Sequence, residues 1–146
     1  MPLDKLACGF ARLAAATGPN PPRDSECGDA CKRIVTAMRE HPEMVSGEGR
    51  FDLDLARATN GRVFSKAGGE AVECVGIPEK GWGVAVKIAD GGSRAVGPAV
   101  VGILSQLGLL NADELDALDS YVHPILRNHR RTAIGTMRMV GVLERV

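Results

Sequence analysis

Residues 62–90 read RVFSKAGGEAVECVGIPEKGWGVAVKIAD, and this stretch decides the fold class. Segments 62–68 and 71–77 carry β-branched and aromatic residues over the length of a strand, and 82–90 alternates large apolar with small or polar residues. The segment 78–81 between the last two contains proline and glycine, which is typical of a turn. We therefore predict three antiparallel strands joined by tight turns.

Helical patterns lie on both sides of these strands, with apolar residues at three- and four-residue spacing. We expect helices over residues 3–16, 26–40, 95–108 and 112–122, a short helix or turn over 52–60, and a last strand or pair of strands over 134–146. In the second helix, Ile34, Val35 and Met38 form the predicted buried stripe. The chain is thus expected to be one α+β domain over 1–146, with an antiparallel sheet flanked by helices.

Composition narrows the classes of partner. The 146 residues are 45% hydrophobic, which argues against disorder, and 18 acidic residues balance 18 basic ones. Nucleic acids and anionic membranes select a basic surface, so neither is expected as the main partner. No apolar run approaches the roughly 20 residues that cross a bilayer. The N-terminal segment is interrupted by charges, unlike a signal peptide, so we expect a cytoplasmic protein.

The four cysteines, Cys8, Cys27, Cys31 and Cys74, are expected to be free thiols in a reducing compartment. Cys27 and Cys31 are four residues apart, so on a helix they would share a face and could form half of a metal site. No second Cys or His pair stands at the spacing that zinc patterns require, so ordinary thiols are the favoured interpretation. Cys74 lies within a predicted strand, where a core thiol is expected.

The stretch SKAGGE (65–70) places a lysine at the end of a strand, followed by two glycines. Such an arrangement leaves backbone N–H groups open beside an ammonium group and can hold a carboxylate or an oxyanion. An ordinary hairpin with a solvated Lys66 is the alternative, and spacing by itself favours it. Ser65 and Lys66 are adjacent, so on a strand they point to opposite faces and cannot act as a nucleophile–base pair.

A second candidate is the stretch HPEMVSGEGRFD (41–52), which separates two predicted helical segments. Gly47 and Gly49 allow the backbone to take positive φ or to approach a ligand closely. Glu48 and Arg50 add opposite charges to the same loop. A site loop and an elaborate connector are both compatible with this pattern.

The order of these motifs resembles the L-asparaginase II family, the Rhizobium-type L-asparaginases. The matching segments are MPLDKLACGFARLA, HPEMVSGEGRFDLDLARATNGRVFSKAGGE, GWGVAVKIADG and the terminal His-Pro, Asn and Gly, which together extend from residue 1 to about residue 141. The resemblance implies hydrolysis of L-asparagine to L-aspartate and ammonia. It also implies a fold similar to that of serine β-lactamases and glutaminases.

In that fold a strand carrying Lys-x-Gly lines the active site, and Lys66-Ala67-Gly68 stands at the matching place. The resemblance therefore makes Lys66 the expected catalytic residue. Glu48, Gly49, Arg50 and Gly68 become the expected substrate-binding or site-loop residues. For the loop, a structural role remains an open alternative.

The departures from the family pattern also matter. The nucleophile-bearing Ser-x-x-Lys elements belong to an N-terminal half that this sequence lacks, so we expect it to match only the C-terminal portion of the family. Asp52 stands where the Rhizobium type has a cysteine. The Cys-x-x-Lys of the Rhizobium-type zinc site is likewise missing, so no metal residue is carried over and zinc is expected only in a complete enzyme.

Two functions follow for the chain. The first is an asparaginase whose partners are L-asparagine and either a second copy of the chain or a missing N-terminal half, which supplies the nucleophile. The alternative is a non-catalytic relative that serves as a binding or assembly module. A fragment of a larger sheet should expose strand edges and apolar helix faces, whereas a stand-alone module should not.

Overall fold

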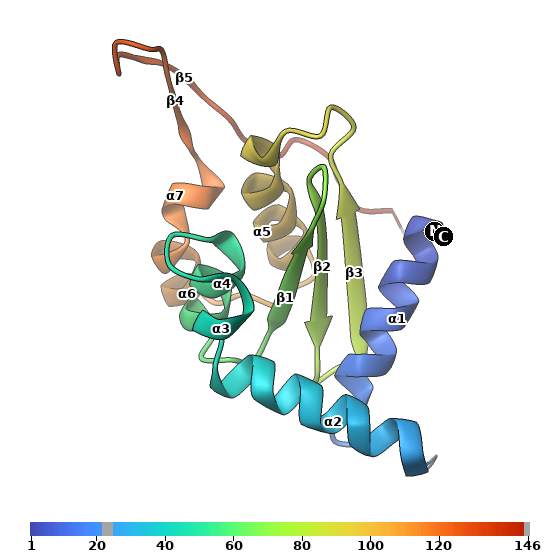
Figure 1. Ribbon diagram of the computed structural model, residues 1–146. Coiled ribbons are helices and arrows are strands. Elements are labelled where there is room, and N and C mark those ends of the chain that lie inside the picture. The colour runs from blue at the N-terminus through green and yellow to red at the C-terminus, as the bar shows by residue number, and fades with distance from the viewer. Residues whose placement is uncertain (22–24, 145–146) are drawn as a thin grey trace.

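The computed structural model describes residues 1–21 and 25–144, and the side chains of the second helix from residue 28 onward. Its elements are α1 (Leu3–Ala15), α2 (Ser25–Glu40), α3 (Glu43–Ser46), α4 (Phe51–Ala58), β1 (Phe64–Gly68), β2 (Val72–Ile77), β3 (Trp82–Lys87), the 3-10 turn η1 (Ser93–Ala95), α5 (Val96–Gln106), α6 (Ala112–Ala117), α7 (Asp119–Val122), β4 (Ile125–Arg127) and β5 (Ala133–Thr136). The α+β class predicted from the sequence is confirmed (Figure 1).

The predicted three-stranded meander is present in the order β1-β2-β3, with both pairs antiparallel. Its register places Lys66 opposite Cys74 and Ala67 opposite Glu73. At the turn between β1 and β2, Glu70 and Ala71 both adopt positive φ, near 54° and 56°, which side chains other than glycine rarely take. This turn stands at the upper end of the sheet in Figure 1.

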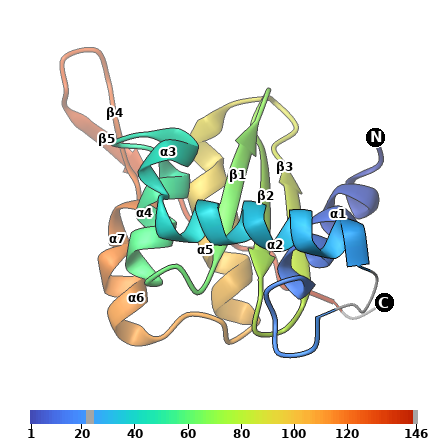
Figure 2. The ribbon, with the colours of Figure 1, turned by 60° about the horizontal axis from the view of Figure 1, so that its bottom comes forward.

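Helices cover both faces of this sheet. α1 packs against β3 and β2, and α2 runs across the end where β1 begins, as Figure 2 shows. α5 packs on the opposite face and is supported by α7, and the larger apolar cluster of the protein lies between α5 and the strands. The approach of α1 is close because β3 has a glycine there. A Cβ atom on Gly83 would stand 2.1 Å from the Ala7 carbonyl oxygen.

Several helix ends follow from local chemistry. Asn111 accepts a hydrogen bond from the Glu114 N–H while the Glu114 side chain accepts one from the Asn111 N–H, which is a complete capping box. Gly108, with φ near 67°, follows the end of α5, close to the predicted end at residue 108. The helix expected over 112–122 is instead two short helices that meet at Leu118.

The predicted buried stripe of α2 is correct at Val35, which is fully buried, but wrong at Ile34, which is 51% exposed. Adjacent positions on a helix are about 100° apart, and α2 contacts the sheet along one narrow line.

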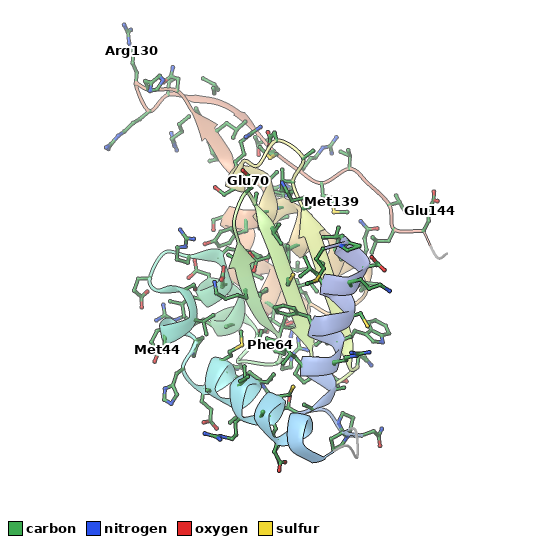
Figure 3. All side chains as sticks on the ribbon, turned by 45° about the vertical axis from the view of Figure 1, so that its right-hand side comes forward. Met44, Phe64, Glu70, Arg130, Met139 and Glu144 are labelled. Atoms are coloured by element: carbon green, nitrogen blue, oxygen red, sulfur yellow. The ribbon has the colours of Figure 1, made fainter. Side chains whose placement is uncertain are left out.

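The C-terminal prediction is wrong in part. A strand pair exists, but it consists of β4 and β5, and residues 137–144 form no helix or strand. The hairpin projects from the body with Arg130 at its tip (Figure 3). The segment after it lies along α5, where Gln106 binds the Gly141 carbonyl and the Leu143 N–H. Strand propensity needs an available sheet edge, and these contacts hold the segment on a helix instead.

Candidate active site

A cleft of about 350 Å³ lies at the end of the sheet where β1 ends and β2 begins. Its walls come from the loop before α4, the adjoining ends of β1 and β2, the start of α5, and α7 with the residues that follow it. α4 and α5 both begin at this cleft. The first N–H groups of a helix have no partner within it, so both helices turn their electropositive ends toward the same space.

The structure brings together three of the five site residues predicted from the sequence. Gly49, Arg50 and Gly68 line the cleft, although they come from two segments of the chain. Glu48 and Lys66 are outside its lining. The Arg50 side chain is exposed and makes no hydrogen bond or ion pair with any described residue, so its guanidinium group is open to an anionic ligand.

Glu48 has a bracing position. Its two carboxylate oxygens accept hydrogen bonds of 2.7 and 2.8 Å from the guanidinium group of Arg57, on α4. These hydrogen bonds lower the pKa of Glu48. Gly47 and Gly49 on either side have φ near 83° and 71°, so the loop needs glycine at both positions. Glu48 therefore fixes a tight loop to the helix that follows it.

Lys66 does not line the cleft but pairs with Asp52, which does. The Asp52 Oδ2 atom accepts a 3.0 Å hydrogen bond from the Ala67 N–H and stands 3.9 Å from the Lys66 Nζ atom. Asp52 is buried in the first turn of α4, where the helix dipole favours a negative charge, while about half of the Lys66 side chain is exposed. Asp52 is thus the residue that stands beside the expected catalytic lysine.

Glu73 is a cleft residue that the sequence reasoning missed. It is 1% exposed, and its Oε1 atom has no hydrogen-bond partner among the described residues. Burial and the nearby charge of Asp52 raise the pKa of Glu73 to about 8, against smaller opposite effects of Ser65, Lys66 and Arg50. A signal was available, because Glu73 is the one charged residue within the otherwise apolar run AVECVGI.

The Ser65 hydroxyl lies on the same side of the sheet as Glu73. Ser65 Oγ is also without a hydrogen-bond partner in the described part of the chain. Two buried polar groups therefore remain unsatisfied on one face of the sheet. Such groups cost folding free energy and call for an explanation.

Tyr121 forms the wall opposite the strands. Its hydroxyl donates a 2.5 Å hydrogen bond to Asp54, and its ring meets Phe51 edge-on at 5.0 Å. Burial, together with Asp54, raises the pKa of Tyr121 to about 12. A Cβ atom on Gly97 would come within 2.8 Å of this ring. These contacts hold α7 against the starts of α4 and α5.

The cleft contains hydroxyl groups but no activated nucleophile. Ser93 and Ser120 line it. Within residues 1–21 and 25–144, neither hydroxyl makes a hydrogen bond to a lysine, histidine or carboxylate that could act as its base. On these residues, the arrangement can bind and polarise a substrate.

The described residues do not fit a metal centre, because they form no group of three or more His, Cys, Asp or Glu side chains that could hold an ion. Cys74 is buried, as expected for a core thiol, and Cys8 is exposed. The Cys27 side chain lies outside the described residues, so the Cys27–Cys31 pair stays a prediction. No helix in the described part of the chain is long and apolar enough to cross a membrane.

Comparison with protein families decides the assignment. The L-asparaginase II family model matches residues 1–139 of the 146. The chain belongs to the L-asparaginase II family. The match covers all the segments that line the cleft, and it agrees with the resemblance found in the sequence from residue 1 to about residue 141. No curated protein shows a significant match to the chain.

Proposed function

We propose that the chain is an amidohydrolase that hydrolyses the side-chain amide of L-asparagine to L-aspartate and ammonia. The observation that carries this proposal is the cleft itself, in which the Arg50 loop meets Ala67 and Gly68 at the end of β1, while Lys66 is paired with the cleft residue Asp52. Together with the membership of the L-asparaginase II family, the guanidinium group of Arg50, which has no partner among the described residues, and the Lys66–Asp52 ion pair support a site for a small zwitterionic substrate.

Each residue has a definite task in the proposed reaction. Arg50 binds the α-carboxylate of the substrate, since its guanidinium group has no protein partner among the described residues. A serine hydroxyl attacks the side-chain amide carbon, and the tetrahedral oxyanion is stabilised by Lys66 and by backbone N–H groups near Gly68. Ammonia leaves with the proton relayed through Lys66, and water then hydrolyses the acyl-enzyme to release aspartate.

The attacking serine in this proposal comes from outside the chain. The support is the lack of a base beside Ser93 or Ser120 in the described part of the cleft, together with the expected Ser-x-x-Lys elements of an N-terminal half. The partner would be that half, either on a separate polypeptide or on a longer form of this one. A zinc site, if the complete enzyme has one, would need ligands beyond the described residues.

The direct experiment measures ammonia release from L-asparagine by the purified chain, alone and mixed with the N-terminal half of a complete family member. We expect release only in the mixture. Lys66→Ala in the mixture should lower turnover by roughly 10²–10³-fold, because a charge that stabilises the oxyanion is lost. Lys80→Ala is the matched control, since Lys80 is exposed on the turn at the other end of the strands. Unchanged turnover in Lys66→Ala would refute its catalytic role.

Exposed apolar side chains favour a second candidate, the assembly module. Met44 is 82% exposed, and Ile134 on the projecting hairpin is 65% exposed. Figure 3 shows Met44 directed away from the body. A non-catalytic module would use such residues to bind a partner chain. Light scattering with Met44→Lys and Ile134→Lys tests this: the module predicts loss of association, together with no ammonia release under any condition.

A further inference from the structure

Glu73 has a place that the roles above do not explain. Glu73 lies on the central strand β2 and is almost fully buried, and its Oε1 atom has no hydrogen-bond partner among the described residues. Its neighbours on the same face of the strand are apolar, with Val75 next toward the core. A glutamate at this position contributes nothing to packing that an apolar residue would not supply better.

The cleft reaches this side chain. Glu73 is part of its lining together with Asp52 and Gly68, so a molecule in the cleft can touch a carboxyl group that bulk solvent scarcely reaches. Charged and titratable groups lie around it on the neighbouring elements. They are Arg50 before α4, Asp52 and Asp54 in the first turn of α4, Lys66 on β1, Arg94 before α5 and Tyr121 on α7.

These groups pair mainly with one another. Asp52 is held by Lys66 and the Ala67 N–H, Asp54 by Tyr121, and Arg94 by Asp90. None of them gives Glu73 a hydrogen bond. Because burial favours its uncharged form at neutral pH, Glu73 offers one O–H donor and one carbonyl acceptor side by side. A primary carboxamide offers the complementary pair, a carbonyl acceptor and an N–H donor in the same spacing.

We propose that Glu73 is the residue of the cleft that recognises a primary carboxamide, through two parallel hydrogen bonds to its carbonyl oxygen and its N–H group. This inference rests on the proposed function, and it assigns the amide end of L-asparagine to Glu73, with the α-carboxylate at Arg50. A carboxylate has no donor, so L-aspartate can make only one of the two hydrogen bonds. Ionised Glu73 would also repel it, together with Asp52. The site therefore retains the amide substrate and releases the acid product.

A purely structural role for Glu73 gives different expectations. In that case its replacement changes the free energy of unfolding but not the affinity of the folded chain for a carboxamide. The pH dependence of ligand binding separates the two roles, because only direct contact makes the affinity follow the ionisation of Glu73. Gln can reproduce both hydrogen bonds without ionising, which makes Glu73→Gln the informative conservative variant.

The test is calorimetric or NMR titration of the purified 146-residue chain with L-asparagine and with L-aspartate between pH 6 and 9.5. For wild type, we expect the dissociation constant for asparagine to rise roughly tenfold over this range, since one hydrogen bond is lost as Glu73 ionises. Glu73→Gln should bind within about threefold of wild type at pH 6.5, and its profile should retain only the titration of the ligand's own amine. Glu73→Leu should bind roughly tenfold or more weakly at every pH.

Circular dichroism first establishes that each variant is folded. Glu79→Leu, an exposed glutamate on the turn at the other end of β2, is the matched control and should bind like wild type. The proposal is overturned if Glu73→Leu binds asparagine as wild type does, if the profiles of wild type and Glu73→Gln coincide, or if the chain shows no saturable binding of asparagine.

Two further results separate this proposal from the proposed function. Ammonia release by the mixture that is unchanged in Glu73→Leu would overturn the role of Glu73 and leave the asparaginase reaction standing. Binding with the pH signature of Glu73, but no ammonia release in the mixture, would support a carboxamide-binding site and refute hydrolysis.

Discussion

The face of the sheet covered by α1 and α2 is closed by a few apolar side chains, whereas the face covered by α5 holds polar groups beside a larger apolar cluster. On the first face, the Phe64 ring lies over Gly76 and stacks on Phe10 at 5.9 Å. On the second, Ser65 and Glu73 are buried without partners. These two groups of the sheet both lie on the face that borders the cleft. One face is thus built for stability, and the other gives up part of its stability to hold a site.

The largest expected effect breaks the stable face. Phe64→Ala removes the side chain that links Ala14, Val35 and the sheet, and should lower the free energy of unfolding by roughly 3–5 kcal/mol. Denaturant unfolding followed by circular dichroism measures the change. A loss below about 1 kcal/mol would mean that neighbouring side chains fill the space left by the ring, and that this face is not the more rigidly packed of the two.

The next prediction concerns the face covered by α5, where a substitution should raise the free energy of unfolding. The raised pKa of Glu73, about 8 against an ordinary 4.5, means that the folded chain keeps a proton which the unfolded chain releases between these values. Wild-type stability should therefore fall as pH rises from about 4.5 to 8 and then level off. Glu73→Gln has no such loss, so its advantage should grow to roughly 4 kcal/mol at pH 8.

Denaturation of wild type and Glu73→Gln at pH 5, 6.5 and 8 checks this growth. Glu79→Gln serves as its control, because Glu79 is exposed and its replacement should shift all three values alike. A constant difference between Glu73→Gln and wild type across this range would show that Glu73 is ionised throughout and that the polar face bears no such cost.

A smaller loss of stability is expected for Gly76→Ala, on the face covered by α1 and α2. A Cβ atom there would stand 2.2 Å from the Phe64 ring, so Gly76→Ala must displace the ring or the strand. We expect a loss of about 1–3 kcal/mol in the free energy of unfolding. In the double variant with Phe64→Ala, the two losses should not add, since the clash disappears with the ring. If the two losses add fully, the destabilisation by Gly76→Ala does not come from its contact with the Phe64 ring.

The smallest effect concerns the site loop. Arg57→Met removes both hydrogen bonds to Glu48, but the pair is exposed, so the unfolding midpoint should stay close to that of wild type. Amide hydrogen exchange of residues 47–50 should nevertheless become faster, because the brace between the loop and α4 is lost. Unchanged exchange would show that Gly47 and Gly49 alone define the loop.

Much of the fold could be predicted because it depends on neighbours along the chain. The two-residue period of 82–90 and the turn at 78–81 indicate the meander, and the Asn111 capping box is readable from a few letters. The strand predicted for residues 137–144 was wrong for the converse reason. This segment contacts α5 through Gln106 and does not pair with the edge of a sheet. The burial predicted for Ile34 was wrong because the helix sequence alone does not specify how wide its contact with the rest of the protein is.

The sequence by itself determined the α+β class, the strand that carries Lys66 and Gly68, and the glycine-bearing loop that carries Arg50. Only the tertiary structure decided that the loop and the strand border one cleft, that Asp52 stands beside Lys66, and that Glu73 is buried there without a partner. The physical reason is that periodicity and turn chemistry act between residues close in the chain. Burial, ion pairing and pKa depend instead on which distant segments pack together.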